Sequence, residues 1–197
     1  MEFVNRFEEK ARIQKMLAAE KPAFMVVYGR RRCGKSTLLK QVLRPKDIFF
    51  MADQTESTYQ LQLFAQQVAV HYPGFDQVKY PNWEVLLNSL NRLLTHRICI
   101  VLDEFPYLVK SAPELPAVIQ KLLDKGENKY DLILCGSSQQ LMHGLVIDST
   151  APLNGRAQLI LKVKPMNAPY LQEVLQCSAS SAIEEYAVWG GVPRYWE

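Results

Sequence analysis

Five short apolar runs, separated by longer amphipathic segments, constrain the fold of this 197-residue chain more than any other feature. Each run is continuous instead of alternating, which is typical of strands that are covered on both faces of a parallel sheet. The runs are residues 24–28, 48–52, 98–102, 132–135 and 159–163. Helices are expected around them at residues 36–43, 58–71, 83–94, 115–123, 168–175 and 182–188. This alternation predicts an α/β three-layer sandwich with a central five-stranded parallel sheet.

A further helix is expected ahead of the first strand. Asn5 and Glu8 resemble a helix N-cap residue and its capping partner. The apolar face of this helix would consist of Phe7, Ala11, Ile13, Met16 and Leu17.

The composition excludes several classes of protein. A hydrophobic content of 48% and a charged content of 22% are ordinary for a folded chain and exclude a mainly disordered one. The longest apolar runs are far shorter than the roughly 20 residues of a membrane span. We therefore expect no membrane partner. The four cysteines show no CxxC spacing, which favours a reducing, cytoplasmic location without a disulfide framework.

Charge is distributed unevenly along the chain. Residues 1–46 hold twelve Lys and Arg against four Asp and Glu, whereas the remainder holds eleven against sixteen. A basic N-terminal quarter suggests that a polyanion binds near that end. Solvated helix faces account for the early lysines, but less easily for Arg30–Arg32, which follow an apolar run and a glycine. These three arginines either touch a phosphate or a partner, or they are simply solvated.

A phosphate-binding loop is expected after the first strand. Residues 29–36, GRRRCGKS, match GxxxxGK[ST] at every fixed position, between an apolar run and a helix. Glycines let backbone amides close around phosphate oxygens, and the helix N-terminus adds its positive dipole end. We expect Lys35 to reach the β- and γ-phosphates and Ser36 to ligate Mg²⁺. The residues expected at the nucleotide are Gly29, Arg30, Arg31, Arg32, Cys33, Gly34, Lys35, Ser36 and Thr37.

Polar residues also follow the third and fourth strands, at the sheet edge where ligands of such folds bind. Asp103 and Glu104 come after four apolar residues, the Walker B pattern. Asp103 is expected to hold Mg²⁺, and Glu104 to activate a water for attack on the γ-phosphorus. Ser137 follows the fourth strand and is expected to contact the γ-phosphate or that water. The alternatives are a turn before Pro106 for Asp103 and a helix cap for the serine.

Taken together, these motifs resemble the P-loop ATPase domain that is widespread in archaea and also present in bacteria, in the AAA+/STAND branch of the ASCE nucleoside triphosphatases. Residues 3–9, FVNRFEE, are similar to that family's adenine-side motif, F-h-N-R-E-x-E, with Phe7 in place of its usual acid. Residues 102–105, 136–137, 153–156 and 190–195 match its Walker B, sensor, Leu-x-Gly-Arg and Gly-Gly-x-Pro-x-Tyr elements.

The resemblance implies ATP and Mg²⁺ as ligands and an extra strand between the two Walker strands. It implies that Val4, Arg6 and Pro193 lie near the nucleotide. It also implies an arginine-finger or sensor role for Arg156, acting within one chain or across a homo-oligomer. From spacing alone, Arg156 is a turn residue before the fifth strand.

The resemblance also sets an expectation for domain organisation. Family members usually continue into further helices, a winged-helix segment and often a nuclease-like domain. We therefore expect an ATPase core at residues 1–165 and the beginning of a helical lid at residues 166–197, within a longer protein. A DNA or protein partner would bind through the further domains.

Three functions fit these features. The first is a Mg²⁺-dependent ATPase that acts as a nucleotide switch. The second is a small-molecule or nucleotide kinase. The third is a non-hydrolysing, ATP-gated module that engages DNA or protein. The Asp103–Glu104 pair favours water as nucleophile. Arg156 and Arg194 are the only arginines after residue 100 of the sequence, which argues against the arginine-rich lid of a kinase.

Overall fold

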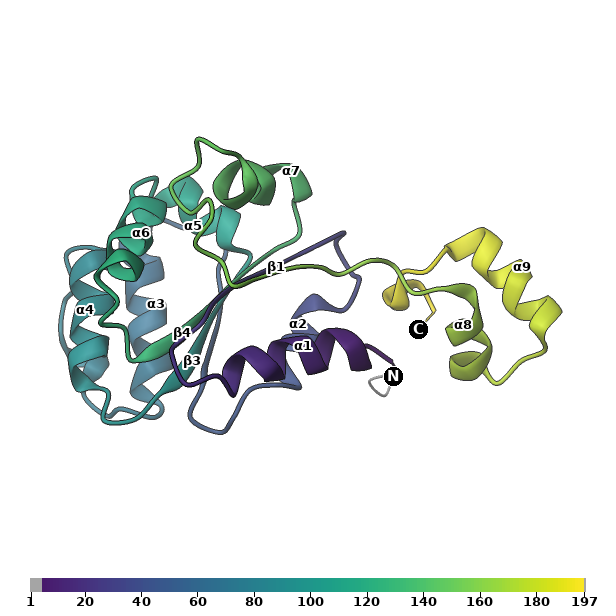
Figure 1. Ribbon diagram of the computed structural model, residues 1–197, viewed down its shortest axis with the longest axis horizontal. Coiled ribbons are helices and arrows are strands. Elements are labelled where there is room, and N and C mark those ends of the chain that lie inside the picture. Colours follow the sequence, from purple (N-terminus) through teal and green to yellow (C-terminus); the bar gives the residue numbers. More distant parts are fainter. Residues whose placement is uncertain (1–4, 197) are drawn as a thin grey trace.

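The chain folds around a five-stranded parallel β-sheet with helices packed on both faces (Figure 1). The computed structural model describes residues 5–196. The strands lie in the order β2-β3-β4-β1-β5. Their bounds are Phe24–Tyr28 (β1), Ile48–Met51 (β2), Ile98–Asp103 (β3), Tyr130–Gly136 (β4) and Leu159–Lys162 (β5). All five predicted strands are confirmed, and β4 is the expected extra strand between β1 and β3.

The helices form two layers on the sheet and a separate pair beyond it. They are α1 (Phe7–Leu17), α2 (Lys35–Lys40), α3 (Ser57–Ala69), α4 (Trp83–Leu93), α5 (Phe105–Ser111), α6 (Leu115–Lys125), α7 (Gln139–Met142), α8 (Ala168–Leu175) and α9 (Ala179–Trp189). Short turns are η1 (Phe75–Gln77), the π-helical η2 (His143–Ile147) and η3 (Pro193–Tyr195). Figure 1 shows α8 and α9 standing apart from the sheet. Within the described range, no helix combines the length and apolar character of a membrane span.

Both faces of the three central strands, β3, β4 and β1, are buried, which explains their nearly continuous apolar runs, whereas the edge strand β5 alternates between buried and exposed residues. In β1, Phe24 and Val26 belong to the core beneath α3, α4, α5 and α6. Met25 and Val27 belong to the second core, which is closed by α1 and α2. Successive side chains of a strand point to opposite faces, so every position of β1 needs an apolar residue.

The start of α1 differs from the prediction. The helix begins at Phe7, and its N-cap is Arg6, which makes no side-chain capping hydrogen bond. The expected capping pair of Asn5 and Glu8 is therefore wrong. Ile13 is fully buried, but Phe7 is 77% exposed. Both Asn5 and Arg6 adopt positive φ angles, 63° and 71°, so tertiary contacts of this segment override the local capping signal.

Helix α5 is a feature that the sequence reasoning missed. The pattern Asp103-Glu104-Phe105-Pro106 suggested a turn, whereas the helix begins at Phe105 with proline in its first turn. Proline is favourable there because the first helical amides have no intrahelical acceptor. This helix follows β3 at the carboxyl-terminal edge of the sheet and has Glu104 at its N-cap position. Helix α7 and turn η2 are likewise absent from the prediction.

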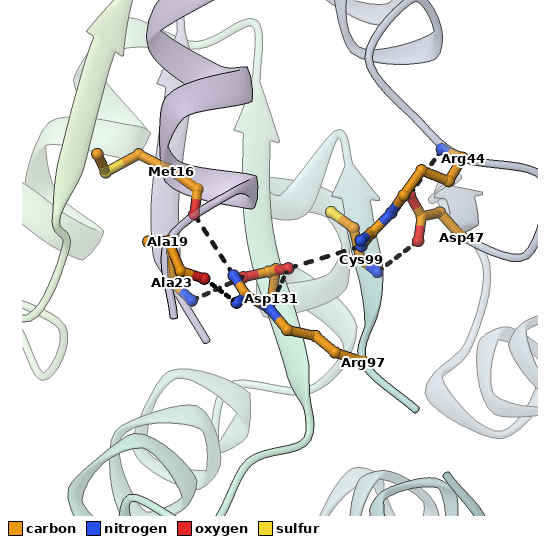
Figure 2. A network of polar contacts seen from close by, with 8 residues as sticks. All are labelled: Met16, Ala19, Ala23, Arg44, Asp47, Arg97, Cys99 and Asp131. Carbon is orange, nitrogen blue, oxygen red and sulfur yellow. Dashed lines mark hydrogen bonds and ion pairs between the residues drawn. The ribbon is translucent and has the colours of Figure 1, made fainter. Parts of the chain in front are cut away.

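A buried polar network fastens the opposite, amino-terminal edge of the sheet (Figure 2). The fully buried carboxylate of Asp131 accepts hydrogen bonds from Ala23 N at 2.7 Å and from Arg97 Nε at 2.9 Å. Arg97 also donates to the carbonyls of Met16 and Ala19 at the end of α1. The network therefore joins β1, β3 and β4 to the last turn of α1.

Replacing Asp131 by alanine should lower the free energy of unfolding by about 3 kcal/mol, because it leaves the Arg97 guanidinium without its buried carboxylate. Urea denaturation followed by circular dichroism measures this change. Glu84→Gln removes an exposed ion pair with Lys121 and serves as the control, for which we expect no measurable change. Equal, small effects of both substitutions would contradict a structural role for the network.

Candidate functional site

The loop between β1 and α2 is shaped by two glycines. Gly34 is the N-cap of α2 and has a φ of +83°, which other residues rarely adopt. A Cβ atom on Gly29 would lie 2.2 Å from the carbonyl oxygen of Val163, so no side chain fits there. The first intrahelical hydrogen bond runs from Leu38 N to Gly34 O at 2.9 Å. Amides of the first turn precede this bond and are available to an anion.

Lys35, Ser36 and Asp103 meet at the carboxyl end of the sheet. Asp103 is the last residue of β3 and is 1% exposed. Its Oδ2 accepts a hydrogen bond of 2.5 Å from Ser36 Oγ, and its Oδ1 accepts one of 2.9 Å from Glu104 N. The buried Lys35 donates from Nζ to the carbonyl of Arg30 at 3.0 Å, within the same loop. The hydroxyl and carboxylate oxygens are hard donors that fit a Mg²⁺ ion.

Glu104 and Ser137 are also brought together, across β3 and β4. Ser137 donates from Oγ at 2.9 Å and from its backbone N at 3.3 Å, both to Glu104 Oε2. Glu104 itself has a positive φ of 52°, which directs its side chain from the end of β3 toward the neighbouring strand. Within residues 5–196, the second carboxylate oxygen, Oε1, has no hydrogen-bond partner. This oxygen is free to accept a proton or a hydrogen bond from a ligand.

The variable positions of the loop divide between solvent and core. Arg30, Arg31 and Arg32 are exposed, and Thr37 is exposed on α2. The guanidinium carbon of Arg32 lies 5.8 Å from the ring centre of Tyr195 in η3. Cys33 is fully buried in the core beneath α1 and α2. The basic triplet is therefore placed at the loop surface, whereas Cys33 anchors the loop from below.

The residues expected on the adenine side have different surroundings. Val4 lies outside the described residues. Arg6 is 5% exposed, and its Nη1 and Nη2 donate to Glu9 and to the carbonyls of Cys33 and Lys164, whereas its buried Nε has no hydrogen-bond partner within residues 5–196. Pro193 begins η3, two residues after Gly191, whose carbonyl accepts a hydrogen bond of 2.7 Å from Met166 N. Sequence reasoning did not find the Lys164 carbonyl, because a backbone contact leaves no side-chain signal.

Arg156 is not part of this constellation. It precedes β5 at the amino-terminal edge of the sheet, where Gln158 N donates to Phe24 O at the start of β1. Its guanidinium donates to Asp124 at 2.8 and 2.9 Å, and these hydrogen bonds lower the pKa of that carboxyl group. Arg156 lines an open cavity of about 540 Å³ at this edge. The structure therefore separates Arg156 from the phosphate-binding loop of its own chain.

Burial raises the pKa of the Cys33 thiol, although the charges of Lys35 and Arg6 act against this rise. A raised pKa keeps the thiol protonated and unreactive to a higher pH. Iodoacetamide at pH 8 should therefore modify the partly exposed Cys177 before Cys33 in the folded protein, as measured by peptide mass spectrometry. In 6 M urea, used as the control, all four cysteines should react. Equal labelling of Cys33 and Cys177 in the folded state would contradict the placement of Cys33.

Known proteins are similar to this chain in sequence or in fold. A family model described as an ATPase domain predominantly from Archaea matches residues 3–195. An uncharacterized protein of Methanocaldococcus jannaschii is 32% identical over 199 residues, covering 99% of this chain but only 43% of that protein. The Walker-type ATPase of Pyrococcus abyssi has a TM-score of 0.75 at 22% identity, covering 98% of this chain and 65% of that one. The Aeropyrum pernix ORC1 protein, solved in complex with DNA, has a TM-score of 0.65 at 22% identity, covering 94% and 51%.

Proposed function

The chain belongs to the family of ATPase domains found predominantly in Archaea, and from this premise we propose that it binds ATP with Mg²⁺ and hydrolyses it as a nucleotide switch of the AAA+/STAND type. One observation carries the proposal. The Ser36 hydroxyl lies 2.5 Å from the Asp103 carboxylate, beside Lys35 in a glycine-anchored loop. Lys35 and Ser36 begin the helix that follows β1, and Asp103 ends β3, two strands that are separated by β4.

Each residue of the loop has a part in binding. Backbone amides of residues 29–37 surround the phosphates, and Lys35 leaves the Arg30 carbonyl to contact the β- and γ-phosphates. With Ser36 and Asp103 as ligands, Mg²⁺ would neutralise charge on the phosphate oxygens. Arg30–Arg32 at the loop surface add positive potential.

Glu104 is the residue that we assign to hydrolysis. Its free Oε1 accepts a proton from the water that attacks the γ-phosphorus, while the bond from that phosphorus to ADP breaks. Ser137 holds the other carboxylate oxygen with two hydrogen bonds and so fixes the direction of Oε1. Ser137 acts here through Glu104, and contact with the γ-phosphate stays a prediction.

Arg156 requires a second copy of the chain. Because it lies at the sheet edge opposite the phosphate-binding loop, we infer that it acts in a neighbouring subunit of a homo-oligomer. There it would neutralise charge that develops on the γ-phosphate. Within one subunit, Asp124 holds its guanidinium. This arrangement would couple hydrolysis to assembly.

The chain spans less than half the length of its Methanocaldococcus relative, so the activity and partners of a whole protein are proposals. We propose an ATPase core at residues 1–165 and the beginning of a helical lid at residues 166–197. Nucleotide-dependent repositioning of this lid would transmit the state of the site to the rest of the protein. The similarity to a structure solved with DNA supports an ATP-gated DNA module as a second candidate. Four free cysteines accord with a reducing, cytoplasmic location.

Phosphate release by the wild-type chain, without an added acceptor, tests the proposal. Glu104→Gln should bind ATP with wild-type affinity but hydrolyse it at least about 10²-fold more slowly, because the proton acceptor is lost.

Lys35→Ala should weaken ATP binding at least about tenfold, because a charge-assisted hydrogen bond is lost. Hydrolysis by Lys35→Ala at the wild-type rate would contradict the assignment. Turnover only with a small hydroxylated acceptor would instead identify a kinase.

Mixing two inactive variants tests the inter-subunit role of Arg156. Arg156→Ala should bind ATP normally and lose hydrolysis by about a thousandfold, as removal of an arginine finger does. Lys35→Ala retains Arg156 but cannot bind ATP well. A mixture of both variants should regain activity, because Lys35→Ala subunits supply Arg156 to the neighbouring Arg156→Ala subunits, whose own nucleotide sites retain Lys35. No recovery in a mixture shown by light scattering to form hetero-oligomers would contradict this role.

A further inference from the structure

Arg6 is a buried charge whose two terminal nitrogens, Nη1 and Nη2, donate to protein groups, whereas its Nε has no partner within the described residues. Charged side chains are almost never fully buried unless they are paired, and Arg6 is only 5% exposed. Its Nη1 pairs with Glu9 Oε1 at 2.8 Å. Its Nη2 donates to Lys164 O at 2.6 Å and to Cys33 O at 3.2 Å. Two of its three partners are therefore backbone carbonyls from distant parts of the chain.

The backbone at Arg6 is held in an unfavourable conformation to make these contacts. Asn5 and Arg6 are consecutive residues with positive φ, at 63° and 71°, and neither is a glycine. Such conformations persist only where the surrounding structure imposes them, and they cluster at functional sites. Here the imposed conformation starts α1 and turns the Arg6 side chain toward the phosphate-binding loop.

The contact with Cys33 determines the direction of an amide in that loop. The peptide bond between Cys33 and Gly34 is planar and trans, so its carbonyl and its N–H point in opposite directions. Arg6 holds the carbonyl on the side of α1, and the N–H of Gly34 is thereby directed to the other side. Within residues 5–196, this N–H has no hydrogen-bond acceptor. It remains available to a phosphate oxygen.

The contact with Lys164 joins the loop to the segment that leads into α8. Val163 N donates to Tyr28 O at 2.7 Å, so this segment runs beside the start of the loop. Further along, Met166 N donates to Gly191 O at 2.7 Å, and Tyr186 of α9 donates to Met166 O at 3.1 Å. Residues 163–166 therefore connect the Arg6 guanidinium to the helical pair.

We propose that Arg6 is a positioning residue that holds the phosphate-binding loop in its binding conformation, by fixing the Cys33–Gly34 peptide and bracing it against residues 163–166. It contacts neither the adenine nor the phosphates. This inference rests on the proposed function, because it concerns the same nucleotide site. It is compatible with the position near the nucleotide that the sequence resemblance implied for Arg6.

The test compares Arg6→Gln and Arg6→Lys with wild type, using two probes: Mg²⁺–ATP and Mg²⁺–tripolyphosphate, which has no base. Isothermal titration calorimetry gives the affinities. Both variants should lose at least about tenfold in affinity for both probes, because the Gly34 amide is no longer held in position. Lysine cannot reproduce the planar guanidinium that donates to the Cys33 and Lys164 carbonyls. Glu9→Gln leaves both carbonyl contacts in place and keeps an amide oxygen as acceptor for Nη1, so it should bind within about twofold of wild type.

Chemical rescue separates positioning from a general loss of folding. Arg6→Ala should lose affinity like Arg6→Gln, and millimolar methylguanidinium should restore part of it. The midpoint of thermal unfolding, measured without nucleotide, identifies any variant that fails to fold. Steady-state kinetics should show a raised KM for ATP with a smaller change in kcat, because the hydrolytic residues are untouched.

Three results would overturn the inference. Loss of affinity for ATP with unchanged affinity for tripolyphosphate would show that Arg6 contacts the base. Wild-type affinity of Arg6→Gln for both probes would show that the loop needs no brace. A wild-type chain that binds neither probe would overturn the proposed function and this inference with it. The titration of the wild-type chain alone distinguishes this result from the other two results.

Discussion

The hydrogen bond between Ser36 and Asp103 is the contact on which the candidate site depends. It joins the start of α2 to the end of β3, although β4 lies between β1 and β3. Only a parallel sheet brings these ends to one edge, because every strand then finishes on the same side. The continuous apolar strands and the two helix layers thus position a hydroxyl and a carboxylate that lie 67 residues apart in the chain.

The two edges of the sheet have separate roles. The carboxyl edge carries the glycine-anchored loop, Asp103 and Glu104. The amino edge carries the buried Asp131 network and the exposed Arg156. Helix α1 connects the two edges. At its N-cap, Arg6 donates to a loop carbonyl, and in its last turn the Met16 carbonyl accepts a hydrogen bond from Arg97. Helix α1 is therefore a continuous element that contacts both the loop and the network at the amino-terminal edge.

Much of this architecture could be predicted from the sequence, because burial on both sheet faces leaves apolar runs and because phosphate chemistry needs fixed residue types. The strands, the glycine-anchored loop and the position of Asp103 at the end of β3 follow from such local signals. The start of α1 could not be predicted, since the conformation of Arg6 is set by carbonyls far along the chain. The separation of Arg156 from the loop follows from its place before the fifth strand, at the amino-terminal edge of a parallel sheet, whereas the role implied by the resemblance carries no information about that edge. Helix α5 was missed because Pro106 suits both a turn and a first helical turn.

A crystal structure with a non-hydrolysable ATP analogue and Mn²⁺ in place of Mg²⁺ tests the central claim most directly. Anomalous scattering locates Mn²⁺ without assumptions about the nucleotide. We predict one anomalous peak beside Ser36 Oγ and Asp103, bridged to the β- and γ-phosphates, with Lys35 turned from the Arg30 carbonyl to those phosphates. An analogue that binds elsewhere on the chain, or that binds in the loop with Mn²⁺ away from Ser36 and Asp103, would contradict the account.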